Sequence, residues 1–528
     1  MVSVLLVLMV LAITHKVWIP ARADIQLSGI KIVAYAACLI MISAWAIIYF
    51  PLVVSSSYMP DEAWFLFTVA TEGHGSGSLS WFDRYFAHPN AFGYGSLWWG
   101  LYSAIVDVSA YFIPPAHSIA GQGYGQIDYR LGLNDVIADG NAYLRTSIWA
   151  MRSLAFSVVA VFILTLSKRS LTEPFAAIGV ALLLSTPMMY WSGKIASPEL
   201  FGVFLLLISV VKYIENKNTW WFVLAGIACG SKLTCAPVAA VMALCAMSYE
   251  WKRGGIKTCL AVAIKLGAGC LLANLYLVVH PIEFVATLLK FSSLFPAAPW
   301  ERSFLEGPLP FWEGGTYGNL SYWYGSIVCF VLVVAISIAA NAKLGTALLL
   351  SALLMFIFML TQPLHNWYWF TVLAGSAIPI SFMNRNNIYS KASIGVAMTM
   401  VVALNAYVST GNVEAEIYNR NVQVAEHSTY PATRACMESS EHSEKTSIVY
   451  DMATIGMVLP VSKEAKNMNY PASFSILPGI ADVGSRTDRL AVIGERAREI
   501  QPIREFLKRA EDGGAKQQWC GKALLIRF

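Results

Sequence analysis

Charged residues are scarce in this sequence. They make up 13% of the 528 residues, whereas hydrophobic residues make up 57%. A soluble globular chain carries about 25% charged residues, so this chain lacks the polar surface that water on all sides would require. The formal net charge is only +5, and the basic residues are scattered between apolar runs, which excludes the dense basic face of a nucleic-acid-binding protein. The composition predicts a polytopic protein in a lipid bilayer.

Metal and redox motifs are also missing. The sequence contains neither a CxxC pair nor an HExxH metal motif, and no internal repeat is evident. Seven of the nine cysteines lie in or beside apolar stretches, where they act as small hydrophobic residues. The other two, Cys436 and Cys520, lie in the polar tail. They are able to pair if that tail faces an oxidising compartment, but the sequence does not show that they meet.

Long apolar runs predict membrane-crossing helices, each of which needs about 20 mainly apolar residues. The predicted spans are 1–15, 30–54, 148–167, 174–193, 198–214, 220–231, 233–249, 258–280, 321–342, 344–362, 366–383 and 392–409. The first run is short, so a signal-like segment is the alternative there. Gly230, Ser231 and Lys232 interrupt the pair at 220–249, which reads as two short helices or one broken helix.

The basic residues of the short loops predict how the chain is oriented, because cytoplasmic loops carry an excess of Lys and Arg. These residues are Lys16, Arg22, Lys31, Lys168, Arg169, Lys212, Lys217, Lys252, Arg253, Lys257, Lys343, Arg385 and Lys391. Their loops alternate correctly through the predicted spans. We therefore expect the loops 55–147 and 281–320 and the tail 410–528 to face outward.

The first outer loop and the tail each have a structure of their own. The loop contains the aromatic stretch WFDRYFAHPNAFGYGSLWWG, which favours one or two helices lying in the membrane interface over a crossing at 90–113. The tail contains the β-like runs TSIVYD and RLAVIGE, and a helical stretch that Pro502 should break or restart. The predicted fold is an α-helical polytopic module of about 11–13 spans over 1–409, followed by a small α/β domain over 410–528.

Three acidic residues, at two places in the sequence, are candidates for chemistry. Asp61 and Glu62 lie directly after the apolar run 30–54, and Glu199 follows Pro198 at the start of another. Each has a plain structural alternative, because carboxylates are favoured at helix N-caps and in first helical turns. All three fall on the predicted outer side of the membrane.

The order of motifs resembles the GT-C superfamily of polyprenyl-phosphate-dependent glycosyltransferases. An apolar span is followed by PDE, an aromatic loop with HPN, an RS pair at the head of a span, ASPEL, AGIACGSKLT and HNWYWFTVLAG. Over about residues 30–410 this is most similar to protein O-mannosyltransferases and the lipid A aminoarabinose transferase. Two positions depart from the family pattern. Asn90 replaces a second proline, and Trp367 stands where a late arginine is often found.

The resemblance implies an inverting transfer of a sugar from a polyprenyl-phosphate donor to an acceptor hydroxyl of a glycan, lipid or protein. A carboxylate must take the hydroxyl proton, and cations must stabilise the phosphate that leaves. The catalytic candidates are Asp61 as base, Glu62 and Glu199. The candidates for donor-phosphate binding are Arg84, His88, Lys194, Lys232 and Arg302, and those for substrate binding are Tyr58, Trp64, His365 and Tyr368. No cofactor is required, and a divalent cation is left open.

Each basic candidate also has a structural alternative. Lys232 interrupts an apolar segment, which by itself points to function, but it could simply reach toward the nearest interface. Arg302 is read more simply as a solvated loop charge, and His365 as an interfacial histidine. For the whole chain the alternatives are a transporter or flippase and a polymerase or ligase of lipid-linked glycans. The expected location is the bacterial inner membrane, with the site and the tail outside.

Overall fold

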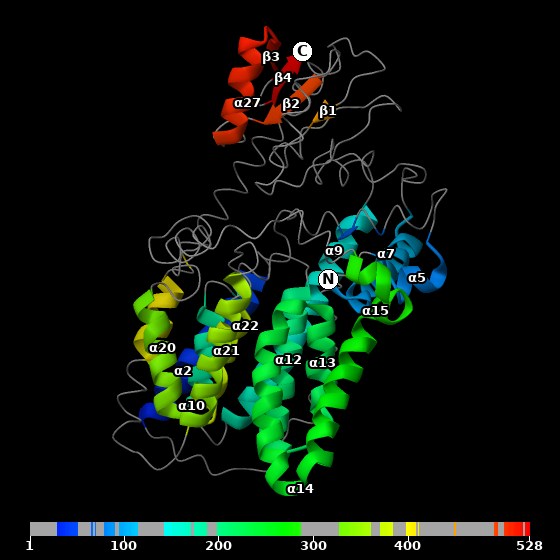
Figure 1. Ribbon diagram of the computed structural model, residues 1–528. Coiled ribbons are helices and arrows are strands. Elements are labelled where there is room, and N and C mark those ends of the chain that lie inside the picture. Colours follow the sequence, from blue (N-terminus) through cyan, green and yellow to red (C-terminus); the bar gives the residue numbers. More distant parts are fainter. Residues whose placement is uncertain are drawn as a thin grey trace. The chain divides into compact units, whose positions relative to one another are not determined.

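The computed structural model describes a mostly α-helical protein (Figure 1). The described residues are 29–50, 65–66, 69, 79–89, 94–114, 142–170, 174–186, 189, 198–286, 327–360, 370–383, 398–407, 410, 448–449, 490–494, 501–520 and 523–527. The chain divides into two compact units. One holds residues 1–57, 81–104 and 148–415, and the other holds 58–80, 105–147 and 416–528.

The centre of the first unit is an antiparallel pair of helices, α12 (Pro198–Asn216) and α13 (Trp221–Ser231). At one end, the Tyr213 ring lies 5.1 Å from the Phe222 ring. Further along, a Cβ on Gly202 would approach the Ala228 carbonyl oxygen to 3.3 Å. The two helices are therefore closely packed along their length, and α9 (Ala142–Ser170) packs against α12 through Phe162 and Phe204.

The next element, α14 (Ala236–Ala273), is a hairpin of two helices rather than one long rod (Figure 1). Gly255 breaks it with φ 63° and ψ −150°, a conformation that favours glycine because other residues carry a Cβ. The Cys259 thiol donates to the Met247 carbonyl at 3.1 Å. Twelve residues span about 18 Å in a straight helix, so this contact requires the chain to reverse. The break lies inside the gap predicted between spans 233–249 and 258–280.

Glycines bring α13 against the second half of α14. Cβ atoms placed on Gly226, Gly230 or Gly269 would each collide with backbone atoms of the facing helix. Small residues at such positions allow two backbones to approach closely, which is the usual basis of helix packing in membranes. The predicted break at 230–232 is confirmed, and the chain forms two helices there rather than one.

A second group of helices also belongs to the first unit. It contains α2 (Gly29–Ala44) with the π-helical turn Trp45–Tyr49, α10 (Pro174–Ser185), α20 (Ile327–Ala340), α21 (Ala342–Leu360), α22 (Phe370–Gly375) and α23 (Ala377–Ser381). Trp45 anchors this group by donating from Nε1 to the Leu184 carbonyl at 2.6 Å. Asn341 donates to the Phe382 carbonyl at 2.8 Å, which ties the α20–α21 turn to the end of α23.

Three further helices lie at the ends of the larger ones: α5 (Trp81–Tyr85), α7 (Ser96–Phe112) and α15 (Tyr276–Val279). Trp81 is 69% exposed while Arg84 is buried. Exposed aromatic rings over a buried inner face are typical of a helix in a membrane interface. Helices do lie within residues 55–147, at α5 and α7, and their location in the membrane interface on the outer side stays a prediction.

Two helical stretches of the described part are long and apolar enough to cross a membrane, Thr146–Leu166 and Leu233–Ala273, and the second is the stretch that Gly255 folds into a hairpin. Five shorter apolar helices accompany them. Large apolar side chains on several of these helices are exposed, for example Ile264 at 67% and Ile47 at 73%. The full set of 11–13 spans stays a prediction, and its first member, 1–15, lies outside the described residues.

The described part of the tail contains four strands and one helix. Its sheet has the strand order β1-β2-β4-β3, with β1 (Ile448–Val449), β2 (Leu490–Gly494), β3 (Lys516–Cys520) and β4 (Ala523–Arg527). β1 and β2 are parallel, and the other pairs are antiparallel. The helix α27 (Gln501–Asp512) starts one residue before Pro502, a position that suits proline, and the predicted helical stretch before it lies outside the described residues.

Candidate functional site

A buried ion pair joins two residues that the sequence had assigned to separate roles. Nζ of Lys232 contacts Oε1 of Glu199, and the two side chains are 7% and 8% exposed. Both lie among apolar helices, where a charge is costly unless it is paired. The ion pair thus brings Glu199 and Lys232 together at one point of the first unit.

The local backbone explains why these two side chains meet. α13 ends at Ser231, and Lys232 adopts an extended conformation with φ −150° and ψ 115° before the 3-10 turn Leu233–Cys235. Glu199 lies in the first turn of α12, where the free backbone N–H groups and the helix dipole favour a carboxylate. Because α12 and α13 are antiparallel, the start of one is level with the end of the other.

The segment that leads into α7 covers this pair. The Tyr94 ring lies with its centroid 4.2 Å from Nζ of Lys232, a distance at which a cation is attracted to the ring face. Gly95 follows with φ 63°, and a Cβ there would collide with the backbone of Gly230 and Ser231. Only glycine fits this approach, so Gly95 sets how closely Tyr94 sits over Lys232.

A hydrogen-bonded joint fixes the same segment to the end of α14. The Ser96 hydroxyl donates to Oδ1 of Asn274 at 3.3 Å and accepts from the backbone N–H of Tyr276 at 3.1 Å. Asn274 is the residue at which α14 ends. Ser96 and Asn274 are both buried, so the joint is shielded from water. This joint fixes the segment of Tyr94 and Gly95 over the ion pair.

Several buried polar atoms of this region have no hydrogen-bond partner within the described structure. They include Oε2 of Glu199, the Ser231 hydroxyl and Nε1 of Trp98. Ser231 directly precedes Lys232, and the Trp98 ring lies 5.5 Å from that of Phe201, two residues after Glu199. A buried polar group without a partner costs about 1–3 kcal/mol, so each such group calls for an explanation, such as strain, a catalytic role, or a bound water or ion.

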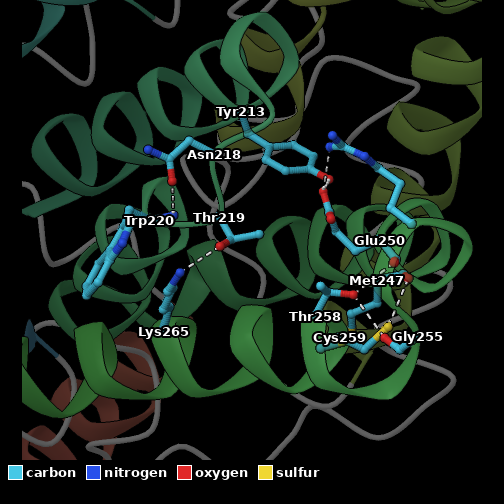
Figure 2. A network of polar contacts seen from close by, with 11 residues as sticks. Tyr213, Asn218, Thr219, Trp220, Met247, Glu250, Gly255, Thr258, Cys259 and Lys265 are labelled. Atoms are coloured by element: carbon cyan, nitrogen blue, oxygen red, sulfur yellow. Dashed lines mark hydrogen bonds and ion pairs between the residues drawn. The ribbon is translucent and has the colours of Figure 1, made fainter.

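The opposite ends of the same helices form a different polar cluster (Figure 2). The Tyr213 hydroxyl donates to Oε1 of Glu250 at 3.0 Å, and Arg253 lies 3.9 Å from the same oxygen. Nearby, Nζ of Lys265 donates to the Thr219 hydroxyl at 2.6 Å. The two basic loops that the sequence placed on one side of the membrane, 212–217 and 252–257, thus meet at one end of the unit.

Lys217, in this second cluster, has a perturbed pKa. Its Nζ lies 5.5 Å from the Tyr213 ring centroid and 5.2 Å from that of Tyr249. Burial against these rings lowers the pKa of Lys217, opposed in part by the carboxylate of Glu250. Lys217 itself is exposed, whereas Tyr213 and Glu250 are buried, so the cluster combines a buried hydrogen bond with cations at the surface.

Two other phosphate-binding candidates precede Tyr94 by a few residues in the sequence and pack against aromatic rings. His88 is fully buried and stacks on Trp99 with 4.2 Å between ring centroids. Arg84 is 9% exposed, and its guanidinium lies 5.7 Å from the Tyr85 ring. The remaining candidates lie outside the residues that the structure describes, namely Asp61, Glu62, Lys194, Arg302, Tyr58, Trp64, His365 and Tyr368.

Sequence reasoning missed Tyr94, Ser231 and Trp98. The one available signal was the glycine pair around Tyr94 in FGYGSLWWG, since glycine often marks a place where two backbones approach closely. Among the described residues, no group of three or more His, Cys, Asp or Glu lies together as metal ligands would. Cys520 is disulfide-bonded, and its partner is outside the residues whose side chains are described.

Comparison of the chain with known proteins finds no match among family models, curated proteins or solved structures.

Proposed function

We propose that this chain is an inverting membrane glycosyltransferase. It moves a sugar from a polyprenyl-phosphate donor to an acceptor hydroxyl of a glycan, lipid or protein at the outer face of a bacterial inner membrane. The proposal includes the full set of 11–13 spans and the resemblance to GT-C enzymes. It needs no cofactor.

The buried pair of Glu199 and Lys232 is the observation that carries this proposal. A transferase of this kind needs a carboxylate and a cation close together, one toward the sugar and the other toward the phosphate. The pair supplies both, in a layer that contains partnerless buried polar atoms. It lies at the helix ends opposite the basic loops, and the positive-inside rule places that side outward.

The proposed roles follow from charge. Lys232 stabilises the charge that develops on the donor phosphate, with Arg84, His88, Lys194 and Arg302 as further candidates for that task. Asp61 takes the proton of the acceptor hydroxyl, and Glu62 and Glu199 hold the sugar. Tyr58, Trp64, His365 and Tyr368 would contact substrate.

The test is transfer by the purified full chain in liposomes that contain a polyprenyl-phosphate-linked sugar and candidate acceptors. Mass spectrometry of surface glycans from a strain lacking the protein identifies the sugar and acceptor to use. We expect Asp61→Asn to lose transfer at least about a hundredfold, the usual share of a general base, while carrier binding is kept. If Asp61→Asn and Glu62→Gln both transfer at the wild-type rate, the proposal fails.

A transporter is the second candidate, and one observation favours it. Lys232 is itself the extended residue between two helices. Transporters build ion and substrate sites at such breaks. A transporter predicts solute flux into liposomes that is lost in Lys232→Met and needs no acceptor. The transferase predicts no flux and a covalent product.

A further inference from the structure

The basic end of the α12–α13–α14 group, made of residues 212–220 and 249–265, carries more positive charge than its own carboxylates balance. These two stretches contain six lysines and arginines but only two glutamates, an excess of four positive charges. Both glutamates are already engaged. Glu215 pairs at 3.0 Å with a lysine one turn earlier, and Glu250 accepts from the Tyr213 hydroxyl at 3.0 Å. An excess of this kind attracts anions from outside the chain.

Four cations at this end are exposed. Lys217, Lys252 and Lys257 form no salt bridge with any residue that the structure describes. Arg253 is 55% exposed and lies 3.9 Å from Glu250, which is beyond hydrogen-bond distance. These four side chains are therefore able to take an anion that the described part of the chain does not supply.

Two of the four cations lie beside one aromatic ring. Nζ of Lys217 is 5.2 Å from the Tyr249 ring centroid, and Cζ of Arg253 is 5.6 Å from the same point. Burial lowers the pKa of Lys217, Glu250 opposes this, and the charge of Arg253 adds to it. An anion that contacts both cations would offset their mutual repulsion.

The backbone of Lys217 indicates that this lysine is kept for a reason other than stability. It directly follows the last residue of α12 with φ 51°, and its N–H donates to the Tyr213 carbonyl at 2.8 Å. Glycine, and less often asparagine, usually takes this left-handed position after a helix, because it is unfavourable for most residues that carry a Cβ. Asparagines precede and follow it, at 216 and 218, yet a lysine occupies the strained position.

Exposed aromatic rings place these cations at the level expected for lipid headgroups. Trp220 and Trp251 are 66% and 57% exposed, and Trp220 belongs to the polar cluster at this end (Figure 2). Tryptophan and tyrosine prefer the interface between membrane and water. Clusters of about four to eight lysines and arginines beside a membrane helix bind anionic headgroups. The exposed cations and rings of this end match that pattern.

We propose that this end of the protein binds the headgroup of an anionic phospholipid, with Lys217 and Arg253 contacting its phosphate and Lys252 and Lys257 adding positive charge around it. The fork of an arginine matches two phosphate oxygens, and the lysine adds a further charged donor. A zwitterionic headgroup brings a cation of its own and would gain less here. The inference goes beyond the proposed function and does not depend on it, because no sugar transfer is involved.

The experiment measures lipid binding to the full chain in a neutral detergent by native mass spectrometry. The probes are phosphatidylglycerol and phosphatidylcholine with the same acyl chains. The wild type should bind phosphatidylglycerol more tightly. A cation near an anionic surface contributes roughly fivefold in affinity, so Lys217→Asn and Arg253→Gln should each weaken phosphatidylglycerol binding about fivefold, and their combination about 25-fold. Phosphatidylcholine binding should not change.

Lys217→Asn also separates binding from folding. Asparagine tolerates the left-handed conformation, so this variant should melt as the wild type does in phosphatidylcholine while it loses affinity for phosphatidylglycerol. The matched control is Lys343→Gln, which removes an exposed lysine near the start of α21 on the same predicted side. It should keep the wild-type affinity.

Three results would overturn the inference. The first is equal binding of the two lipids by the wild type, and the second is a loss of affinity in Lys343→Gln as large as that in Lys217→Asn. The third is displacement of phosphatidylglycerol by excess inorganic phosphate, which would assign the cations to a soluble anion. Binding requires neither sugar nor acceptor, so a protein without glycan transfer tests this inference equally well.

Discussion

The Glu199–Lys232 pair predicts strong non-additivity between two substitutions. Glu199→Gln leaves a buried lysine without its carboxylate, and Lys232→Met leaves a buried carboxylate without its ammonium. Breaking a buried pair by removing one partner costs about 3–5 kcal/mol, and both side chains are less than a tenth exposed. The double variant removes both charges and leaves only a buried amide, at about 1–3 kcal/mol. The coupling free energy should then be at least about 3 kcal/mol.

The assay is thermal unfolding of the four proteins in one detergent at one scan rate, since membrane proteins often unfold irreversibly. For a chain this large, 1 kcal/mol shifts Tm by about 2 °C. Each single variant should therefore melt about 6–10 °C lower, while the double variant should melt at most about 6 °C lower. Single shifts below about 2 °C, or a double shift equal to their sum, would show that the two charges are neither buried nor coupled.

Three other predictions test the surroundings of the pair and the orientation of the chain. Gly95→Ala should lower Tm by several degrees because its Cβ meets the backbone of α13, whereas Gly267→Ala, which meets nothing within 4 Å, should not; equal shifts would show that the close approach is absent. Tyr213→Phe leaves Glu250 with one hydrogen bond fewer and should cost about 1 kcal/mol, read from the same melts, and an unchanged Tm would contradict it. A membrane-impermeant maleimide should label the Lys257→Cys variant more strongly than the wild type, which carries only the native thiols, and only after right-side-out vesicles are opened. Stronger labelling of the variant in sealed vesicles would contradict the predicted sidedness.

The helical architecture could be read from the sequence where apolar runs end in distinctive residues. The break at Lys232 was visible because a lysine rarely interrupts an apolar helix without reason. The turn at Gly255 was expected only as a loop, since the sequence does not show that one left-handed glycine suffices to reverse the chain. Close contacts among the glycines of α13 and α14 depend on which faces meet, and periodicity alone does not specify that.

The tail likewise contains strands that the sequence predicts and one strand that it does not. β1 and β2 follow from apolar β-branched runs, whereas β3 does not, because four of its five residues are exposed and KQQWC has no apolar alternation. β3 is a strand because it pairs with β4 along five positions. This pairing is a tertiary effect that outweighs local preference.

The site itself was only half accessible to sequence reasoning, and the reason is physical. Glu199 and Lys232 are charged residues inside apolar segments. Because burying a charge there costs free energy, each of them stands out in the sequence. Tyr94 and Ser231 are ordinary residues whose importance depends on the approach of two segments more than a hundred positions apart. A single sequence contains no signal for such an approach beyond the glycines that make room for it.

The two polar ends of the α12–α13–α14 group show why only one of them is a candidate for chemistry. At the basic end, Glu250 accepts from the Tyr213 hydroxyl and faces an arginine that is 55% exposed. Only the arginine of this pair is solvated, because the Glu250 side chain is 6% exposed, and the buried carboxylate already has the Tyr213 hydroxyl as a donor. At the other end, Glu199 and Lys232 are both buried and the second carboxylate oxygen has no partner. Replacing such a pair by two apolar residues is often neutral or even stabilising, so stability alone does not account for the pair, whereas a role in the proposed transfer would.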